Sequence, residues 1–98
     1  MCRALYVKKL QDYGASWRIM RPESLTDQIF IKAKRIRSIE TKGVSLIDEG
    51  IKSELIGIVN YGVIALIQLE YGFSDTVDKD ADWAIREYDK YSQAALDL

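Results

Sequence analysis

Polar side chains interrupt an otherwise apolar segment in the middle of the sequence. Glu49, Glu54 and Asn60 fall within residues 45–72, where helical spacing places Glu49 and Asn60 on one stripe with Glu54 beside it. Carboxylates on adjacent helical turns can share one hydrated Mg²⁺, which prefers carboxylate oxygens together with phosphate. We therefore expect Glu49 and Glu54 to hold any divalent cation and Asn60 to face a ligand. The alternative is that both carboxylates are solvated and Asn60 bonds to a neighbouring helix.

A second set of candidate residues lies where the first predicted helix ends. Residues 9–17 read Lys-Leu-Gln-Asp-Tyr-Gly-Ala-Ser-Trp, so Asp12, Tyr13 and Trp17 surround a glycine turn. Aromatic rings can stack on a nucleobase, and a carboxylate can accept a hydrogen bond from the edge of that base. This pattern is compatible with a base-binding loop. The alternative is that Tyr13 and Trp17 close the core under the loop.

Four cations crowd into residues 32–37, which read Lys-Ala-Lys-Arg-Ile-Arg. Lysine and arginine both bind phosphate, and the arginine fork can do so through two hydrogen bonds. Lys32 and Arg35 lie near one edge of the predicted helix, so we expect these two to be phosphate ligands. A run of this kind is also typical of a solvated helix face.

Composition excludes several kinds of chemistry. The 98 residues contain no His and a single Cys, which excludes His-based catalysis, a His metal ligand, an internal disulfide and a cysteine zinc cluster. Residues 1–42 carry ten Lys and Arg against four Asp and Glu (+6), whereas residues 43–98 carry four against eleven (−7). The two parts either complement each other or form a basic and an acidic wall of one site. The net charge of −1 disfavours direct nucleic-acid binding by the whole chain.

Helical periodicity dominates the chain, and no long alternation of apolar and polar residues predicts strands. We expect an all-α fold in one domain, a small bundle of about four helices. The predicted helices cover residues 3–13, a second helix capped by Ser24 or Thr26 and ending near 42, a long central helix over 46–72, and a last helix over 80–98 capped by Asp78 or Asp80.

The central predicted helix is apolar on most sides between Leu55 and Leu69. A helix that is hydrophobic all round must be surrounded, and the other helices have stripes too narrow to cover it. We therefore expect a homodimer that completes the bundle. The run is 15 residues long, short of the roughly 20 that span a bilayer. With no visible signal peptide, the sequence predicts a cytoplasmic protein that does not insert into membranes.

Three blocks of sequence resemble the nucleotide modification associated domain family, an all-helical bacterial and phage family. The blocks are residues 9–17, 27–36 and 48–62, and the resemblance covers about residues 2–72 in the same order. It implies a link to modified-nucleotide metabolism. Taken with the chemistry above, the expected nucleotide-binding residues are Asp12, Tyr13, Trp17, Lys32, Arg35 and Asn60, with Mg²⁺ on Glu49 and Glu54.

A looser resemblance connects the chain to the MazG-like, all-α nucleoside triphosphate pyrophosphohydrolases. Those enzymes hold Mg²⁺ on a triphosphate with an E-x-x-E and an E-x-x-D pair. Glu54-Leu-Ile-Gly57 is similar to the second pair, but Gly57 stands where Asp is expected, and the first pair is absent. A magnesium-dependent pyrophosphohydrolase-like activity would thus lack part of its acidic motif.

Two classes of function follow from these patterns. The first is a helical domain that binds or processes a nucleotide. The second is a non-catalytic helical module for dimerisation or interaction. The unit that resembles the family spans residues 1–72, and the last predicted helix, residues 80–98, belongs either to this bundle or to the start of a second, tandem unit.

Overall fold

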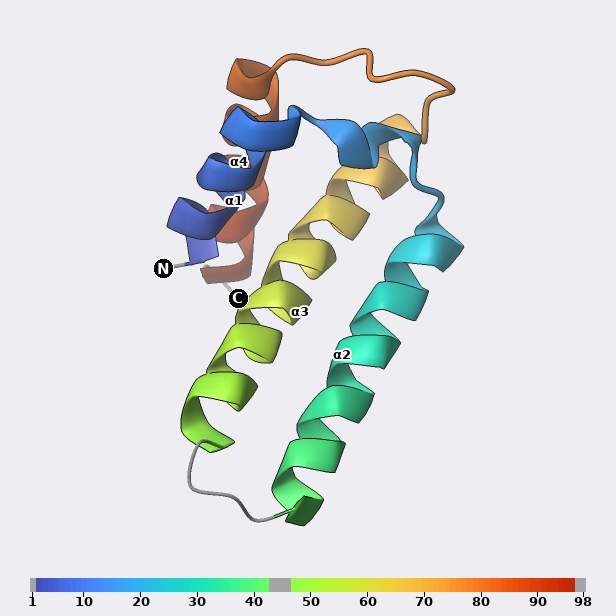
Figure 1. Cartoon of the computed structure of the whole chain (residues 1–98). Coiled ribbons are helices and arrows are strands. Elements are labelled where there is room, and N and C mark those ends of the chain that lie inside the picture. Colours follow the sequence, from blue (N-terminus) through green and yellow to red (C-terminus); the bar gives the residue numbers. More distant parts are fainter. Residues whose placement is uncertain (1, 43–46, 97–98) are drawn as a thin grey trace.

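The computed structural model describes residues 2–42 and 47–96 and confirms the all-α fold, since neither range contains a strand. α2 and α3 form a long antiparallel hairpin, and α1 and α4 lie together against one half of α3 (Figure 1). The other half of the hairpin extends beyond them. The elements are α1 (Cys2–Tyr13), η1, a turn of 3-10 helix (Ser16–Ile19), α2 (Pro22–Lys42), α3 (Ile47–Tyr71) and α4 (Ala81–Leu96).

The ends of the helices follow local residue preferences, with one correction. Gly14 after α1 and Gly72 after α3 adopt φ of 65° and 76°, which glycine reaches without steric cost. The Asp80 carboxylate accepts the Trp83 N–H at 2.8 Å, which confirms the expected cap of α4. The expected cap of α2 at Ser24 or Thr26 was wrong. That helix begins at Pro22, since proline lacks an N–H that the first helical turn would leave unpaired anyway.

α2 packs closely on α3 where α3 has glycines. A Cβ on Gly57 would lie 2.8 Å from the side chain of Lys32, and one on Gly50 would lie 3.1 Å from the Ile39 methyl group. The missing side chains let the stem of Lys32 cross the surface of α3. This packing positions the ammonium group of Lys32 beside α3 rather than in solvent.

The core is concentrated where α1, η1, α3 and α4 meet. Tyr6 stacks on Tyr88 with ring centroids 4.3 Å apart, and the Tyr6 hydroxyl donates to the Ala84 carbonyl at 3.1 Å. Burial, with a smaller contribution from Tyr88, raises the pKa of Tyr6 far above its ordinary value, so the phenol stays neutral. The buried apolar residues are Tyr6, Leu10, Ala15, Trp17, Leu25, Val63, Ile64, Ile67, Ala84 and Tyr88.

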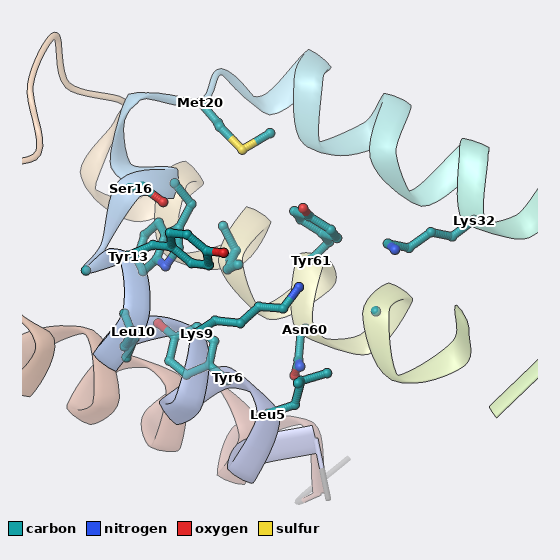
Figure 2. Close-up of a pocket in the computed structure, with 14 residues that line it drawn as sticks. Leu5, Tyr6, Lys9, Leu10, Tyr13, Ser16, Met20, Lys32, Asn60 and Tyr61 are labelled. Carbon is teal, nitrogen blue, oxygen red and sulfur yellow. The ribbon is translucent and has the colours of Figure 1, made fainter. Parts of the chain in front are cut away.

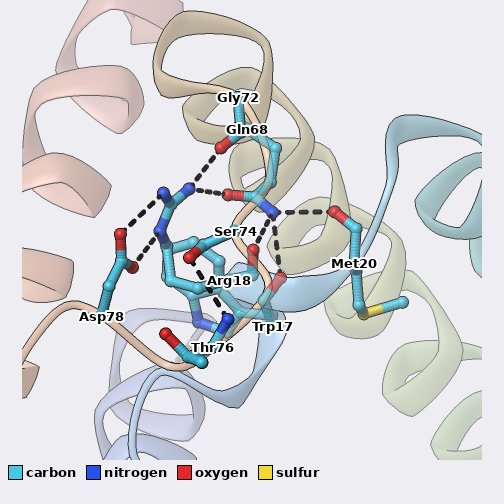
Figure 3. Close-up of polar contacts among 8 residues, drawn as sticks. All are labelled: Trp17, Arg18, Met20, Gln68, Gly72, Ser74, Thr76 and Asp78. Atoms are coloured by element: carbon cyan, nitrogen blue, oxygen red, sulfur yellow. Dashed lines mark hydrogen bonds and ion pairs between the residues drawn. The ribbon is translucent and has the colours of Figure 1, made fainter.

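A buried arginine ties the segment after α1 to the segment after α3. The Arg18 side chain is only 3% exposed, and its guanidinium donates to the Asp78 carboxylate at 3.0 and 3.4 Å, to the Gly72 carbonyl at 2.6 Å and to the Gln68 side-chain oxygen (Figure 3). The Arg18 hydrogen bond holds the pKa of Asp78 below its ordinary value. The ion pair therefore stabilises the fold fully at pH values above the ordinary pKa of aspartate. This contribution is lost as the pH falls through the lowered pKa of Asp78.

Gln68 completes the same network from α3. Its side-chain nitrogen donates to the carbonyls of Trp17, Arg18 and Met20 at 3.1, 2.9 and 2.8 Å (Figure 3). A buried polar group is tolerated when its hydrogen bonds are made, and this amide makes them on both of its ends. The Arg18–Gln68 contact thus fixes η1 on α3.

Among the described residues, one helical stretch is long and apolar enough to cross a membrane. It is Gly50–Tyr71 within α3, and 22% of its most apolar window is buried within the chain. A single helix of this kind is weak evidence for a membrane span, and two sides of α3 carry protein helices. The cytoplasmic location stays a prediction, as does the division into a family-like unit and a possible tandem unit.

Replacing Gln68 with leucine should destabilise the fold. The change removes three donated hydrogen bonds and one acceptor of Arg18, which should lower the free energy of unfolding by about 2–4 kcal/mol. Urea denaturation followed by circular dichroism measures this. The control Gln11→Leu changes an exposed residue of α1 and should change the free energy of unfolding by less than about 0.5 kcal/mol. Equal effects of the two substitutions would contradict a structural role for the Gln68 amide.

Candidate nucleotide-binding pocket

A pocket of about 260 Å³ opens between α1, η1 and α3, with Lys32 of α2 at its side. This volume lies just below the roughly 300 Å³ at which small-molecule sites begin. In Figure 2, Lys9 and Lys32 reach from different helices toward the space beside Tyr61. The lining residues are Leu5, Tyr6, Lys9, Leu10, Tyr13, Gly14, Ser16, Trp17, Met20, Lys32, Gly57, Asn60, Tyr61 and Ile64.

The structure brings together four of the six residues expected to bind a nucleotide. Tyr13, Trp17, Lys32 and Asn60 all line the pocket. Asp12 and Arg35 do not line it, and both are exposed. Asp12 lies one residue before Tyr13 on α1, and successive helical residues point about 100° apart.

The two lysines at the pocket differ in their surroundings. The Lys32 ammonium lies 3.6 Å from the Glu54 carboxylate and 5.7 Å from the centre of the Tyr61 ring, and its side chain is 19% exposed. Lys9 is exposed and has no ion-pair partner within residues 2–42 and 47–96. Lys9 is thus the cation at the pocket whose charge no carboxylate of the described chain offsets.

Trp17 and Tyr13 differ in depth. Trp17 is 8% exposed and belongs to the core, as the alternative interpretation of this segment expected, yet it also forms part of the pocket wall. Its indole N–H is buried and has no acceptor in hydrogen-bonding geometry, although the indole lies close enough to Tyr6 to oppose the rise in the pKa of Tyr6. Tyr13 is 73% exposed, so it borders the opening rather than closing the core.

Asn60 bonds to the neighbouring helices. Its side-chain nitrogen donates to the Cys2 carbonyl at 3.1 Å, and its oxygen accepts from the Tyr88 hydroxyl at 2.8 Å. These bonds join α3 to α1 and α4, so the amide has a structural role at the floor of the pocket. Any contact of Asn60 with a ligand would be additional to these bonds.

Glu54, one of the two acidic residues expected to hold magnesium, does not line the pocket. The Glu54 carboxylate faces two cations, with Lys32 at 3.6 Å and Arg35 at 3.7 Å, and the side chain of Glu49 lies outside the described residues. No group of three acidic, His or Cys residues able to hold a metal ion occurs in the part of the chain that the structure describes. A carboxylate already neutralised by two cations fits a magnesium site poorly. Magnesium binding through Glu49 and Glu54 stays a prediction, and no chemical step is derived from it.

The opposite charges of the two halves meet within one chain. Arg3 pairs with Asp89 at 2.8 Å, Arg18 pairs with Asp78, and Lys32 and Arg35 share Glu54. These pairs support the interpretation in which the basic and acidic parts complement each other. Gly57, where the pyrophosphohydrolase motif would need an acid, is covered by the stem of Lys32.

Sequence reasoning missed Lys9 and Tyr61 as pocket residues. A signal for Lys9 was present, because Lys9 and Tyr13 are four residues apart and so share one face of a helix. Tyr61 had a weaker signal as the neighbour of Asn60. The Arg18–Gln68 contact had none, since it joins residues 50 positions apart.

The fold and the pocket define a small helical-bundle domain with a cationic, aromatic-lined site. A family model described as nucleotide modification associated domain 1 matches residues 9–69, more than half of the chain. The chain belongs to this family. Comparison with curated proteins and with solved structures gives no significant match. Similarity to MazG-like pyrophosphohydrolases therefore stays a prediction.

A double-mutant cycle should show that Asn60 is structurally coupled to Tyr88. Asn60→Ala leaves the buried Tyr88 hydroxyl without an acceptor, and Tyr88→Phe removes that hydroxyl. We expect the two losses of unfolding free energy to be non-additive by about 0.5–1.5 kcal/mol. Thermal or urea unfolding of the two single variants and the double variant measures the coupling. Strictly additive losses would show that this hydrogen bond contributes nothing to the fold.

Proposed function

We propose that the chain binds a nucleotide in this pocket, with the phosphate near Lys9 and Lys32 and the base against Tyr13, Trp17 and Tyr61. The observation that carries the proposal is the arrival of two lysines from different helices at one aromatic-lined pocket. Membership of a family associated with nucleotide modification supports the same class of ligand.

The charges at the pocket suit a phosphate. Lys9 has no ion-pair partner within the described residues, and the 3.6 Å separation of Lys32 from Glu54 is too long for a hydrogen bond. An incoming phosphate would offer both ammonium groups shorter, charge-assisted hydrogen bonds. Because Lys9 is exposed, this attraction should weaken as the salt concentration rises.

The aromatic residues suit a base. Every nucleobase has a face that can stack on an aromatic ring, and Tyr13 presents a largely exposed ring at the opening. Trp17 and Tyr61 supply further aromatic surface to the wall of the same pocket.

The proposal is one of binding, without a catalytic step. Glu54 is ion-paired, and Gly57 supplies no carboxylate where the pyrophosphohydrolase motif requires one. The second class of function, a non-catalytic interaction module, is supported by an apolar face of α3 that the described part of the chain leaves uncovered. The two functions use different sides of α3 and are compatible.

Replacing Lys9 with alanine should weaken nucleotide binding about tenfold, since it removes one charge-assisted hydrogen bond worth roughly 1.4 kcal/mol. Calorimetric titration with the common deoxynucleoside monophosphates at low salt, without added metal, measures the dissociation constants. The matched control is Lys8→Ala, which removes the same charge from the adjacent exposed position outside the pocket lining and should change affinity less than about twofold. The proposal fails if wild type binds none of these nucleotides, or if both variants lose affinity equally.

A further inference from the structure

One face of α3 has no partner within the described chain. α2 covers the side that carries Gly50 and Gly57, and α1 and α4 cover the side that carries Asn60. The remaining side exposes four large apolar residues, with 49%, 48%, 44% and 68% of their surfaces open. We call this face the outer seam. Its residues are Leu55, Val59, Gly62, Leu66 and Leu69.

The spacing of the outer seam is that of a helix-pairing surface. Its five residues follow one another at intervals of four, three, four and three, the heptad spacing that two packed helices bury between them. Gly62 lies at the centre, and nothing in the described chain lies within 4 Å of where its Cβ would be. Glycine lowers helix propensity, and no neighbour within the chain requires it here. A close approach from outside the chain would account for it.

The two ends of the outer seam have complementary shapes. A hollow of about 290 Å³ lies at its N-terminal end, and Leu69, the most exposed residue of the seam, projects at its C-terminal end. Leu55 beside the hollow and Leu69 are each seven residues from Gly62, or about 10 Å along the helix. The hollow is lined by Cys2, Ile51, Lys52, Leu55, Ile56 and Val59.

The charges beside the outer seam are also complementary. Lys52, at the end with the hollow, has no ion-pair partner among the side chains that the structure describes. At the other end, Glu70 and Glu87 share the single cation Lys90, at 3.0 and 3.6 Å, so this cluster is net negative. Lys52 and Glu70 are 18 residues apart, which is five full helical turns, so they lie on the same edge of α3. When two α3 helices pair antiparallel, this edge of one helix lies beside the same edge of the other.

We propose that the outer seam binds a second copy of this chain, with the two α3 helices antiparallel about a two-fold axis at Gly62. This pairing puts Leu69 of each copy against the hollow of the other, Val59 opposite Leu66, and Lys52 near the acidic cluster. An interface that is complementary to itself in shape and charge is what a two-fold homodimer requires. The opposite side of α3 remains available to the nucleotide pocket, so the dimer does not depend on ligand binding.

Lipid is the other occupant that an apolar seam could have. The polar side chains Asn60 and Gln68 are bonded to protein on the covered sides of α3, and α2 exposes charged residues along its outer surface. Neither feature suits a helix surrounded by hydrocarbon. The experiment distinguishes the two occupants.

Analytical ultracentrifugation at micromolar concentration should give twice the 11.2 kDa of the chain. Val59→Glu should give monomer, because it buries an unpaired charge in the seam. Val77→Glu is the matched control, since Val77 is 51% exposed, against 48% for Val59, and lies outside the seam; this variant should remain dimeric. A monomeric wild type would overturn the proposal, as would dimers of both variants.

Two further measurements keep the result independent of misfolding. Gly62→Leu should leave the monomer helical, since no described group outside its own helix backbone and chain neighbours lies within 4 Å of the added Cβ, yet weaken dimerisation about tenfold or more by separating the helices. Cys2, the single cysteine, lines the hollow, so its reaction with a thiol reagent should slow as wild type dimerises and stay fast in Val59→Glu. Unchanged dimerisation in Gly62→Leu, or flotation of monomeric wild type with phosphatidylcholine vesicles, would exclude the seam as a self-association surface.

Discussion

The buried contact between Arg18 and Gln68 is the interaction on which the rest of the molecule depends. η1 is a single helical turn and has little stability of its own, and the loop over residues 72–80 has no regular structure. Arg18 binds the loop through Asp78 and Gly72, while Gln68 donates to the carbonyls of Trp17, Arg18 and Met20 in and just after η1. The contact thus locks both connections onto the end of α3 and sets where α1 and α4 can pack.

The pocket depends on this contact. Trp17, which precedes Arg18, forms part of the pocket wall, and its carbonyl is held by Gln68. Lys9 and Tyr13 come from α1, whose course into η1 is fixed by the same network. Lys32 reaches the site independently, because Gly57 lets its stem lie across α3. The site is therefore assembled from two structural units, the locked turn of η1 and the glycine crossing of α2 with α3.

Much of the architecture could be predicted from local patterns. The helices, the glycine after α1 and the cap at Asp80 all follow from preferences that act within a few residues. The start of α2 was misplaced because Pro22 and the serine and threonine after it give competing signals. The Arg18–Gln68 contact could not be predicted, since an isolated glutamine in an apolar run gives no indication of a distant partner. The same limit applies to the pocket. Sequence patterns identified Tyr13, Trp17, Lys32 and Asn60, but Asp12, whose side chain points about 100° from that of Tyr13, and Arg35 remain exposed outside the pocket.

The central claim is that the pocket around Trp17 binds a nucleotide, and the Trp17 indole N–H reports on it directly. The chain has two tryptophans, Trp17 and Trp83, so their indole N–H signals can be assigned in a ¹⁵N NMR spectrum with Trp83→Phe. Trp83 does not line the pocket. Titration with a deoxynucleoside monophosphate should shift the Trp17 signal progressively, because Trp17 lines the pocket, and should shift the Trp83 signal less, because that ring stacks on Trp17 without lining the pocket. A nucleotide that shifts only Trp83, or neither signal at saturating concentration, would contradict the account.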